Sequence, residues 1–380
     1  MRLKSLQYTA HEGAAEEWRL RGLTLQDVNL LVGRNASGKS RILNVLYHLV
    51  RALTSRQNLS YGHCWLTFDH QGMEIQYELD MRGGKIVREV FMIDCETHLE
   101  RGCGGKGTIF AVKESRQIEF QTPETQLAVV ARRDTIQHPY FEPLHQWAES
   151  LYYYAFGTSL GQEKLFFFVV SNDEESKIDL KDPSQVVAIF RKGEQEFGQR
   201  FTSAVKDDFG AIGYEIEEVG LSQPHNIRVK RPILSALYGI YVKEADLSGM
   251  TDQYVMSQGM FRALSIIVQI NYAVLADTPS CILIDDIGEG LDFERSCSLI
   301  DVLNAKAANS SVQLLMATND RFVMNRVPLE VWSIVDRQGG HVNIRNYANS
   351  KDLFDKFKFT GLNNFDFFAL DYLHASAADA

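Results

Sequence analysis

The residues with the clearest chemical capacity form one segment, Gly33-Arg34-Asn35-Ala36-Ser37-Gly38-Lys39-Ser40, which has the pattern G-x-x-x-x-G-K-S. Glycine-rich loops of this kind curl so that successive backbone N–H groups point at phosphate oxygens, and the following helix adds its positive end. We therefore predict a phosphate-binding loop (P-loop) that extends to Arg41. Lys39 would reach the β- and γ-phosphates of ATP, and the Ser40 hydroxyl would ligate Mg²⁺. An ordinary Gly/Ser loop is the alternative, which the strand–loop–helix order of the sequence disfavours.

A pair of acids far downstream could complete such a site. The apolar residues 281–284 end in Asp285-Asp286. An acid at the carboxyl end of a buried strand beside a P-loop is the usual second anchor for Mg²⁺, the Walker B position. We expect Asp285 to hold the metal through water and Asp286 to polarise the attacking water. Two acids that simply begin a loop are the alternative, which the P-loop upstream weakens.

Three shorter segments accompany the P-loop and the acid pair. Ser257-Gln258-Gly259 precedes an apolar helix expected at residues 263–275. Leu291-Asp292 follows the acid pair closely, within a glycine-containing loop. Residues 313–318 read as another buried strand, and it ends in Asn319-Asp320.

Alternating and helical hydrophobic periodicities indicate the elements that must position these residues. We expect strands at residues 3–8, 18–20 and 28–32 and a helix from Lys39 to about Ser55. Residues 61–135 predict a mainly antiparallel β subdomain, with strands at 63–68, 74–80, 85–93, 108–112, 117–120 and 127–132. An aromatic-rich helix is expected at 139–156, a strand at 165–170, an amphipathic helix at 185–209 and strands within 214–242.

Composition places limits on function. Of 380 residues, 45% are hydrophobic and 23% are charged, as in ordinary soluble globular proteins. No apolar run is long enough to span a bilayer and the first residues resemble a strand, so we expect a cytoplasmic protein without a membrane partner. Five cysteines without C-x-x-C spacing indicate reduced structural thiols.

The net charge bears on nucleic-acid binding. A formal charge of −10 argues against a chain coated in nucleic-acid-binding surface, yet it leaves a local basic groove open. The candidates are Arg132-Arg133 and the group Arg228, Lys230 and Arg231. Each is equally consistent with solvated strand edges.

The order of the motifs resembles that of the ABC-type ATPases: a P-loop, S-x-G at a helix start, a strand with an acid pair, L-D, and a strand with a polar end. The loop G-R-N-A-S-G-K-S looks like the G-x-N-x-S-G-K-S loop of the structural-maintenance-of-chromosomes and recombination branch. Overall the chain is most similar to the ABC-like ATPases of prokaryotic anti-phage defence, including the OLD (overcoming lysogenization defect) nucleases. The resemblance covers residues 1–50 and 250–340.

This resemblance implies an α/β P-loop NTPase of the ABC-ATPase head type, with a mixed central sheet, an antiparallel β subdomain and a helical insertion. Residues 1–345 would form one head: a nucleotide-binding core at 1–60 and 240–345, the β subdomain at 61–135 and the insertion at 136–240. Residues 346–380 would form a docking tail.

The resemblance also implies a homodimer that sandwiches two ATP molecules. Ser257 and Gly259 match the signature that caps the γ-phosphate of the opposite subunit, and Asp292 matches an acid that crosses the interface. Asn319 falls where many relatives have a switch histidine. For the glutamine that helps to bind Mg²⁺ our candidate is Gln137.

Two departures from the family pattern point to a slow switch. Asp286 stands where the family usually has glutamate, which shortens the reach to the attacking water. Asn319 can hydrogen-bond a phosphate but cannot carry a proton as histidine can.

What the chain lacks shapes the functional hypothesis. No sustained heptads indicate a coiled coil, and the roughly 35 residues after 345 are too few for a nuclease domain. We therefore expect a nucleotide-driven switch that controls a separate effector protein, in anti-phage defence by resemblance. The alternatives are a DNA-repair or chromosome ATPase with a basic groove across the dimer, and a non-hydrolysing module clamped by ATP.

Overall fold

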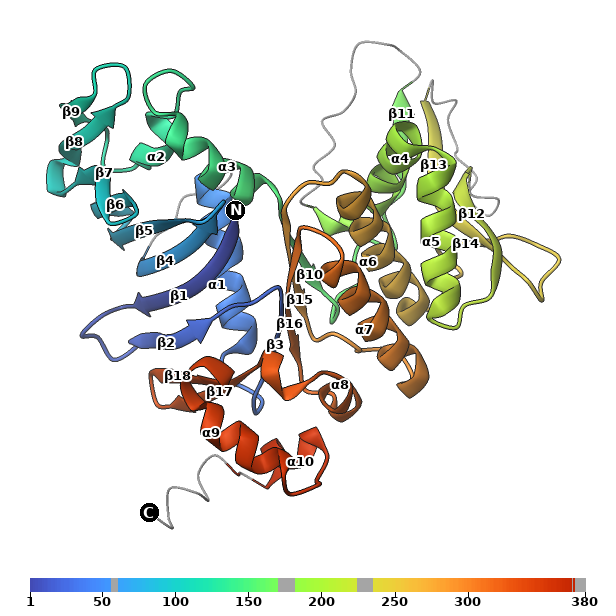
Figure 1. Cartoon of the computed structure of the whole chain (residues 1–380). Helices are drawn as coiled ribbons and strands as arrows, with labels where there is room; N and C mark the ends of the chain where they lie inside the picture. Colours follow the sequence, from blue (N-terminus) through green and yellow to red (C-terminus); the bar gives the residue numbers. More distant parts are fainter. Residues whose placement is uncertain (56–60, 170–181, 224–234, 371, 373–380) are drawn as a thin grey trace. The chain divides into compact units, whose positions relative to one another are not determined.

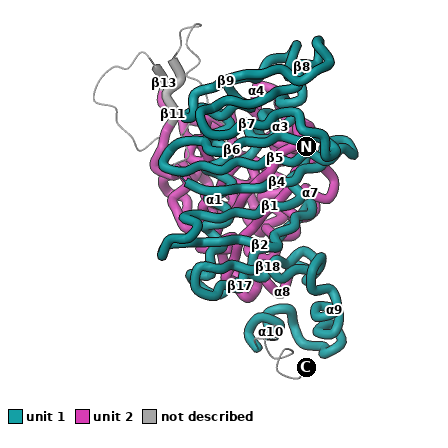
Figure 2. The backbone as a smooth tube through the Cα atoms, turned by 90° about the vertical axis from the view of Figure 1, so that its left-hand side faces the viewer, with its two compact units in different colours: residues 1–151, 327–380 teal, residues 152–326 magenta. Residues whose placement is uncertain are grey.

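The structure is a computed structural model that describes residues 1–55, 61–169, 182–223, 235–370 and 372 (Figure 1). The described chain divides into two compact units. The first comprises residues 1–151 with 327–380, and the second comprises residues 152–326 (Figure 2). Residues 240–326 of the expected nucleotide-binding core therefore lie in the second unit, whereas residues 1–60 lie in the first.

A long mixed sheet forms the first unit. Its strands lie in the order β3-β17-β18-β2-β1-β4-β5-β6-β7-β8-β9. Figure 2 shows the run from β17 through β18, β2, β1, β4 and β5 to β6. The pairs β3–β17 and β2–β18 are parallel, and the other pairs are antiparallel. Their bounds are Arg2–Ala10 (β1), Trp18–Thr24 (β2), Val28–Val32 (β3), Gly62–His70 (β4), Met73–Arg82 (β5), Lys85–Ile93 (β6), Glu96–Arg101 (β7), Lys106–Ala111 (β8), Arg116–Gln121 (β9), Trp332–Gln338 (β17) and His341–Asn346 (β18).

Helix α1 (Lys39–Leu53) begins directly after the P-loop and is amphipathic. Its apolar residues recur every three or four positions, and that face is buried. The helix α3 (Glu142–Glu149) packs on α1, and the Trp147 ring of α3 meets Phe68 of β4 edge to face, with ring centroids 4.8 Å apart. The helix α3 therefore lies between α1 and β4.

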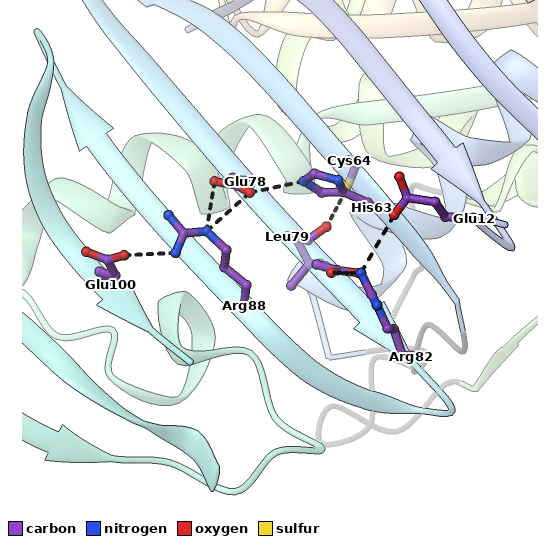
Figure 3. Close-up of polar contacts among 9 residues, drawn as sticks. Glu12, His63, Cys64, Glu78, Leu79, Arg82, Arg88 and Glu100 are labelled. Atoms are coloured by element: carbon purple, nitrogen blue, oxygen red, sulfur yellow. Dashed lines mark hydrogen bonds and ion pairs between the residues drawn. The ribbon is translucent and has the colours of Figure 1, made fainter. Parts of the chain in front are cut away.

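One face of the antiparallel part of this sheet carries a ladder of cross-strand ion pairs (Figure 3). The Glu78 carboxylate lies between His63, with Nε2 at 3.0 Å, and Arg88, with Nε at 3.3 Å. Arg88 also donates to Glu100 at 2.9 Å. In this cluster His63 and Arg88 each face an acid.

The tail folds onto the first unit. It forms α9 (Tyr347–Lys358) and α10 (Asn364–Ala369). The Phe367 ring is fully buried and contacts the rings of Phe354 and Phe357, with centroids 4.9 and 4.8 Å away. Asn364 Nδ2 donates to the Val327 carbonyl oxygen at 2.9 Å. Phe354, Phe357 and Phe367 of the tail therefore pack within this unit.

The second unit contains the other half of the predicted chemistry. Its strands β10, β15 and β16 are neighbours in that order, and β15 pairs with β16 in parallel. A separate small antiparallel sheet has the order β11-β13-β12, with β14 beside β13. The bounds are Leu151–Ala155 (β10), Phe166–Val169 (β11), Ile216–Ser222 (β12), Ser235–Glu244 (β13), Thr251–Asp252 (β14), Ser280–Asp285 (β15) and Val312–Thr318 (β16).

Helices surround the central helix α6 of this unit. The helices α4 and α5 both pack on α6, which is buried along most of its length. Their bounds are Val186–Phe197 (α4), Gln199–Ala211 (α5), Gln258–Leu275 (α6), Phe293–Ala308 (α7) and Arg321–Arg326 (α8). In the part of the chain that is described, no helix combines the length and apolarity needed to cross a membrane.

The expected α/β class is confirmed, with its mixed sheet, antiparallel β subdomain and helical insertion, but three predicted elements are wrong. The expected strand 127–132 contains the short helix α2 (Ala128–Ala131), because the Glu89 carboxylate accepts hydrogen bonds from the N–H groups of Ala128 and Val129. The expected helix 139–156 ends at Glu149, and its aromatic residues continue as β10. The expected helix 185–209 is interrupted at Gly198, whose φ of 56° and ψ of −136° are accessible to glycine alone.

Candidate nucleotide-binding site

The segment Gly33–Ser40 has the form of a P-loop. It leaves the buried strand β3 and turns into α1, whose first residue is Lys39. Ala36 and Gly38 take left-handed conformations, with φ of 62° and 111°. The Lys39 ammonium folds back over the loop and donates to the carbonyl oxygens of Gly33 at 2.8 Å and of Arg34 at 3.3 Å. A lysine held over a curled loop at a helix N-terminus is placed to meet phosphate oxygens.

The packing of the loop leaves no room for side chains at its glycines. A Cβ on Gly33 would lie 2.7 Å from Ser37 Oγ and 2.9 Å from the Val335 carbonyl oxygen. A Cβ on Gly38 would lie 3.2 Å from the Trp18 indole. The Ser37 hydroxyl and Trp18 Nε1 are buried, and neither has a hydrogen-bond partner among the described residues. A tight cradle with buried polar hydrogens lacking partners fits a polyanion such as a nucleoside triphosphate.

Arginines surround this loop. The exposed Arg41 guanidinium carbon lies 4.4 Å from the centroid of the Trp18 ring. Partial burial lowers the pKa of Arg41, yet the guanidinium stays charged at neutral pH. Arg337 donates from Nη1 to the Ala36 carbonyl oxygen at 2.9 Å and so ties the loop to β17. The first unit thus presents positive charge beside the candidate phosphate site.

A cavity of about 470 Å³ adjoins the outer half of the loop. Two aromatic residues of α10, Phe367 and Phe368, form part of its wall. Its other lining residues are Arg34, Asn35, Ala36, Ser37, Ile334, Val335, Asp336, Arg337 and Gly339.

The acid pair lies in the second unit, at the end of the fully buried strand β15. Asp285 is 8% exposed, and its carboxylate accepts a hydrogen bond from the Tyr153 hydroxyl at 3.3 Å. Asp286 has a φ of 54°, a conformation that side chains rarely adopt and that clusters at functional sites. The next residue is held to β16, because Ile287 N donates to the Ala317 carbonyl oxygen at 3.0 Å.

Two residues near the acid pair were missed by the sequence reasoning. Tyr153 lies in the segment that was expected to be helical, and an assignment of its aromatic run to a strand beside β15 would have placed it. Glu289 follows the acid pair by three residues, and its carboxylate lies beside Gly157 together with that of Asp286. A Cβ on Gly157 would lie 3.2 Å from Glu289 Oε2 and 3.9 Å from Asp286 Oδ2.

The S-x-G segment begins α6 as expected. The Ser257 side chain caps the helix by accepting a hydrogen bond from Met260 N at 3.2 Å. Gly259 packs against the loop after the acid pair, since a Cβ on it would lie 2.2 Å from the Gly290 carbonyl oxygen. The buried Arg262 donates to the carbonyl oxygens of Glu289 and Thr158 at 3.1 and 3.0 Å. The sequence motifs at 257–259 and 288–292 are therefore adjacent in the second unit.

Asp292 begins the next helix. Its carboxylate caps α7 by accepting from Arg295 N at 2.9 Å, and it pairs with the Arg295 guanidinium at 2.5 Å. The backbone hydrogen bond from Arg295 and the guanidinium lower the pKa of Asp292. The carboxylate stays charged and is half exposed.

The remaining candidates lie apart from these groups in the chain. Asn319 is exposed and directly follows β16. Gln137 belongs to the first unit, where its amide oxygen accepts from Lys113 N at 3.2 Å and its own N–H donates to Asp134. These hydrogen bonds give Gln137 a structural role in the first unit. That Gln137 helps to bind Mg²⁺ stays a prediction.

The predicted basic residues are engaged within the first unit where the structure describes them. Arg132 donates from Nε to Thr122 Oγ1 at 3.2 Å, and its guanidinium lies over the Phe120 ring at 5.5 Å. Arg133 pairs with Glu142 at 3.3 Å. The group Arg228, Lys230 and Arg231 lies outside the described residues.

Comparisons with known proteins find similarity in structure alone. No protein-family model and no curated protein matches the sequence. A head domain of SMC from Thermotoga maritima is 13% identical, with 91% of this chain and 99% of that chain covered and a TM-score of 0.46. The SmcHead bound to the C-winged helix domain of ScpA is also 13% identical, covering 91% and 97% with a TM-score of 0.49.

A third similar structure is the Smc head domain with an extended coiled coil bound to the C-terminal domain of ScpA, derived from Pyrococcus furiosus. It is 11% identical and covers 94% of this chain and 99% of that chain, with a TM-score of 0.48. Because these identities and TM-scores are low, we base the functional assignment on the residues of the chain itself.

Proposed function

We propose that this chain is an ABC-like ATPase head that binds and hydrolyses ATP and acts as a dimeric switch. The observation that carries the proposal is the geometry of Gly33–Ser40: a curled loop between a buried strand and a helix, with Lys39 folded over its carbonyl oxygens. The two residue types at the helix start, lysine and serine, are those that P-loop enzymes use for phosphate and Mg²⁺.

The residue types assigned to magnesium suit that ion. Mg²⁺ prefers oxygen ligands, and the motifs assign to it the Ser40 hydroxyl of the first unit and the Asp285 carboxylate of the second, which accepts a hydrogen bond from Tyr153. When bound, the ion would neutralise charge on the phosphate oxygens. Lys39 would leave the loop carbonyls for the β- and γ-phosphates, and Asp286 would orient water toward the γ-phosphate. Asn319 would donate a hydrogen bond to that phosphate.

The dimeric arrangement is proposed from residues of the second unit. Ser257 caps α6 with its side chain, Gly259 lets the loop after the acid pair pack against the helix start, and the half-exposed Asp292 begins α7. We propose that these residues complete the ATP site of a second copy of the chain. ATP would then close the dimer and hydrolysis would reopen it, changing the surface shown to a separate effector protein.

The setting of the switch is inferred from the sequence motifs. The motifs resemble those of anti-phage defence ATPases. We therefore propose a role in anti-phage defence, in the cytoplasm. The matched structures give no support for that role. A non-hydrolysing module clamped by ATP is the second candidate, favoured by the short carboxylate of Asp286 and by Asn319 in place of histidine. Both substitutions reduce the capacity to activate water and move a proton.

Light scattering with and without ATP and Mg²⁺, together with phosphate release, tests the proposal. The variants are Lys39→Ala, which should lose binding, and Asp286→Asn, which should trap a closed dimer without turnover. Asp277→Asn is a matched control, because Asp277 also has a positive φ of 47° in an exposed turn, and asparagine tolerates this conformation. Release of phosphate that persists in Lys39→Ala would contradict the proposal. ATP-dependent dimerisation without phosphate release in the wild type would favour the clamp.

A further inference from the structure

The stacked pair of Trp18 and Arg41 is the feature of the loop region that phosphate binding does not use. Trp18 is 1% exposed and lies against Gly38, whereas Arg41 is exposed in the first turn of α1. The guanidinium carbon lies 4.4 Å from the centroid of the indole ring, well within the range of a cation–π contact. One face of the guanidinium is therefore held by the protein.

Several arginines of the first unit are neutralised by acids, and Arg41 is not among them. Arg2, Arg19, Arg82, Arg88 and Arg101 all form ion pairs with acids. In the described chain Arg41 has no acidic partner within ion-pair distance, and the titratable groups that act on its pKa are Tyr8 and Arg337. A planar cation that is oriented by an indole and not neutralised by an acid is ready to receive a ligand.

The position of Arg41 indicates which part of a nucleotide it meets. Lys39 and Ser40 are the residues assigned to the β- and γ-phosphates and to Mg²⁺. Arg41 is the next residue of the same helical turn, so it lies beside the α-phosphate and nucleoside end of a triphosphate bound at the helix N-terminus. Planar guanidinium groups stack on nucleobases as aromatic rings do.

We infer that the base of the bound nucleotide stacks on the guanidinium of Arg41, which the Trp18 indole orients. This inference rests on the proposed function and identifies the residue that contacts the nucleoside part of the nucleotide. Trp18 is a positioning residue, because it contacts the guanidinium and not the base. The ligand class is a purine nucleoside triphosphate, whose large ring covers the guanidinium best.

Binding of ATP and of inorganic tripolyphosphate, each with Mg²⁺, separates the base from the phosphates. Arg41→Lys keeps the positive charge but removes the planar surface, so we expect ATP affinity to fall roughly 3- to 30-fold. Tripolyphosphate affinity should stay within about twofold. Arg51→Lys is the matched control on the same helix, since the Arg51 guanidinium lies over the Tyr47 ring at 5.5 Å. It should change neither affinity.

Three results would overturn the inference. Arg41→Lys could leave the affinity for ATP unchanged. It could also lower the affinities for ATP and tripolyphosphate equally, and Arg41 would then be a phosphate ligand only. Phe368→Ala could lower ATP affinity alone, which would place the base in the cavity beneath α10. Lys39→Ala should lose binding of both ATP and tripolyphosphate, which tests the P-loop independently of Arg41. Absence of any binding to the wild type would contradict the proposed function itself, and this inference with it.

Discussion

Gly259 lies so close to Gly290 that a Cβ on Gly259 would stand 2.2 Å from the Gly290 carbonyl oxygen. Arg262, one turn further along α6, reinforces the contact by donating to the neighbouring Glu289 carbonyl oxygen at 3.1 Å. The start of α6 and the loop after the acid pair therefore form one packed body. In the proposed dimer, a shift at the start of α6 would move this loop.

We expect Gly259→Ala to abolish ATP-dependent dimerisation while leaving ATP binding at the P-loop intact. The added methyl group must push the loop at 288–292 away, at a cost of about 1–3 kcal/mol in the free energy of unfolding. Thermal unfolding and light scattering measure the two effects. Gly210→Ala in α5 is the control, because a Cβ there meets nothing within 4 Å. Normal dimer closure by Gly259→Ala would show that this packing is not coupled to the interface.

We expect Tyr153→Phe to raise the Mg²⁺ concentration needed for half-maximal phosphate release several-fold. The variant removes the hydroxyl that donates to Asp285 Oδ2 at 3.3 Å, and loss of an outer hydrogen bond to a metal ligand weakens metal binding. Tyr254→Phe is the control, because its hydroxyl donates at 2.8 Å to a backbone carbonyl, that of Glu163. An unchanged Mg²⁺ dependence in Tyr153→Phe would exclude Asp285 as an oriented metal ligand.

Local patterns were sufficient to predict the P-loop, its flanking strand and helix, and the strand that ends at Asp285. These elements follow from short-range periodicity and from glycine and lysine at fixed spacing. The capping of α6 by Ser257 and of α7 by Asp292 was implicit in residue types that favour helix starts. Residues that act within a few positions of one another are thus readable from the sequence.

Features that depend on distant segments were not readable. The strand β10 was mistaken for helix, since its place is set by the hydrogen bond from Phe156 N to the Asp285 carbonyl oxygen and by that from Tyr154 to Gln269. The helix α2 depends on the carboxylate of Glu89, far earlier in the chain. Likewise, the spacing of Trp18 and Arg41 in the sequence does not predict that their side chains stack.

Arg101→Met should be the most destabilising single change in the β subdomain. Arg101 and Glu89 form an ion pair at 2.8 Å in which both side chains are fully buried. Removing one partner leaves a buried charge without its counterion, which costs about 3–5 kcal/mol in the free energy of unfolding. Arg116→Met in β9 is the control, because its pair with Glu114 is solvent-exposed and contributes at most about 1 kcal/mol. Urea unfolding compares the two, and equal losses would contradict the assignment.

Asp292→Asn should lower thermal stability near neutral pH by an amount that disappears in acid. Hydrogen bonds from Arg295 lower the pKa of Asp292 in the folded state below its ordinary value of 3.8. A lowered folded pKa stabilises the protein above the unfolded value, and that stabilisation is lost as the pH falls through the folded pKa. Asparagine still caps α7 but carries no charge.

Thermal unfolding of both proteins from neutral pH downward tests this linkage. The difference in Tm between wild type and Asp292→Asn should be constant above about pH 5 and should close as the pH falls below 3.8. Asp277→Asn, in the exposed turn after α6, controls for loss of one negative charge. A difference that stays constant into acid would mean that the Asp292 carboxylate acts as a neutral cap, without gain from its charge.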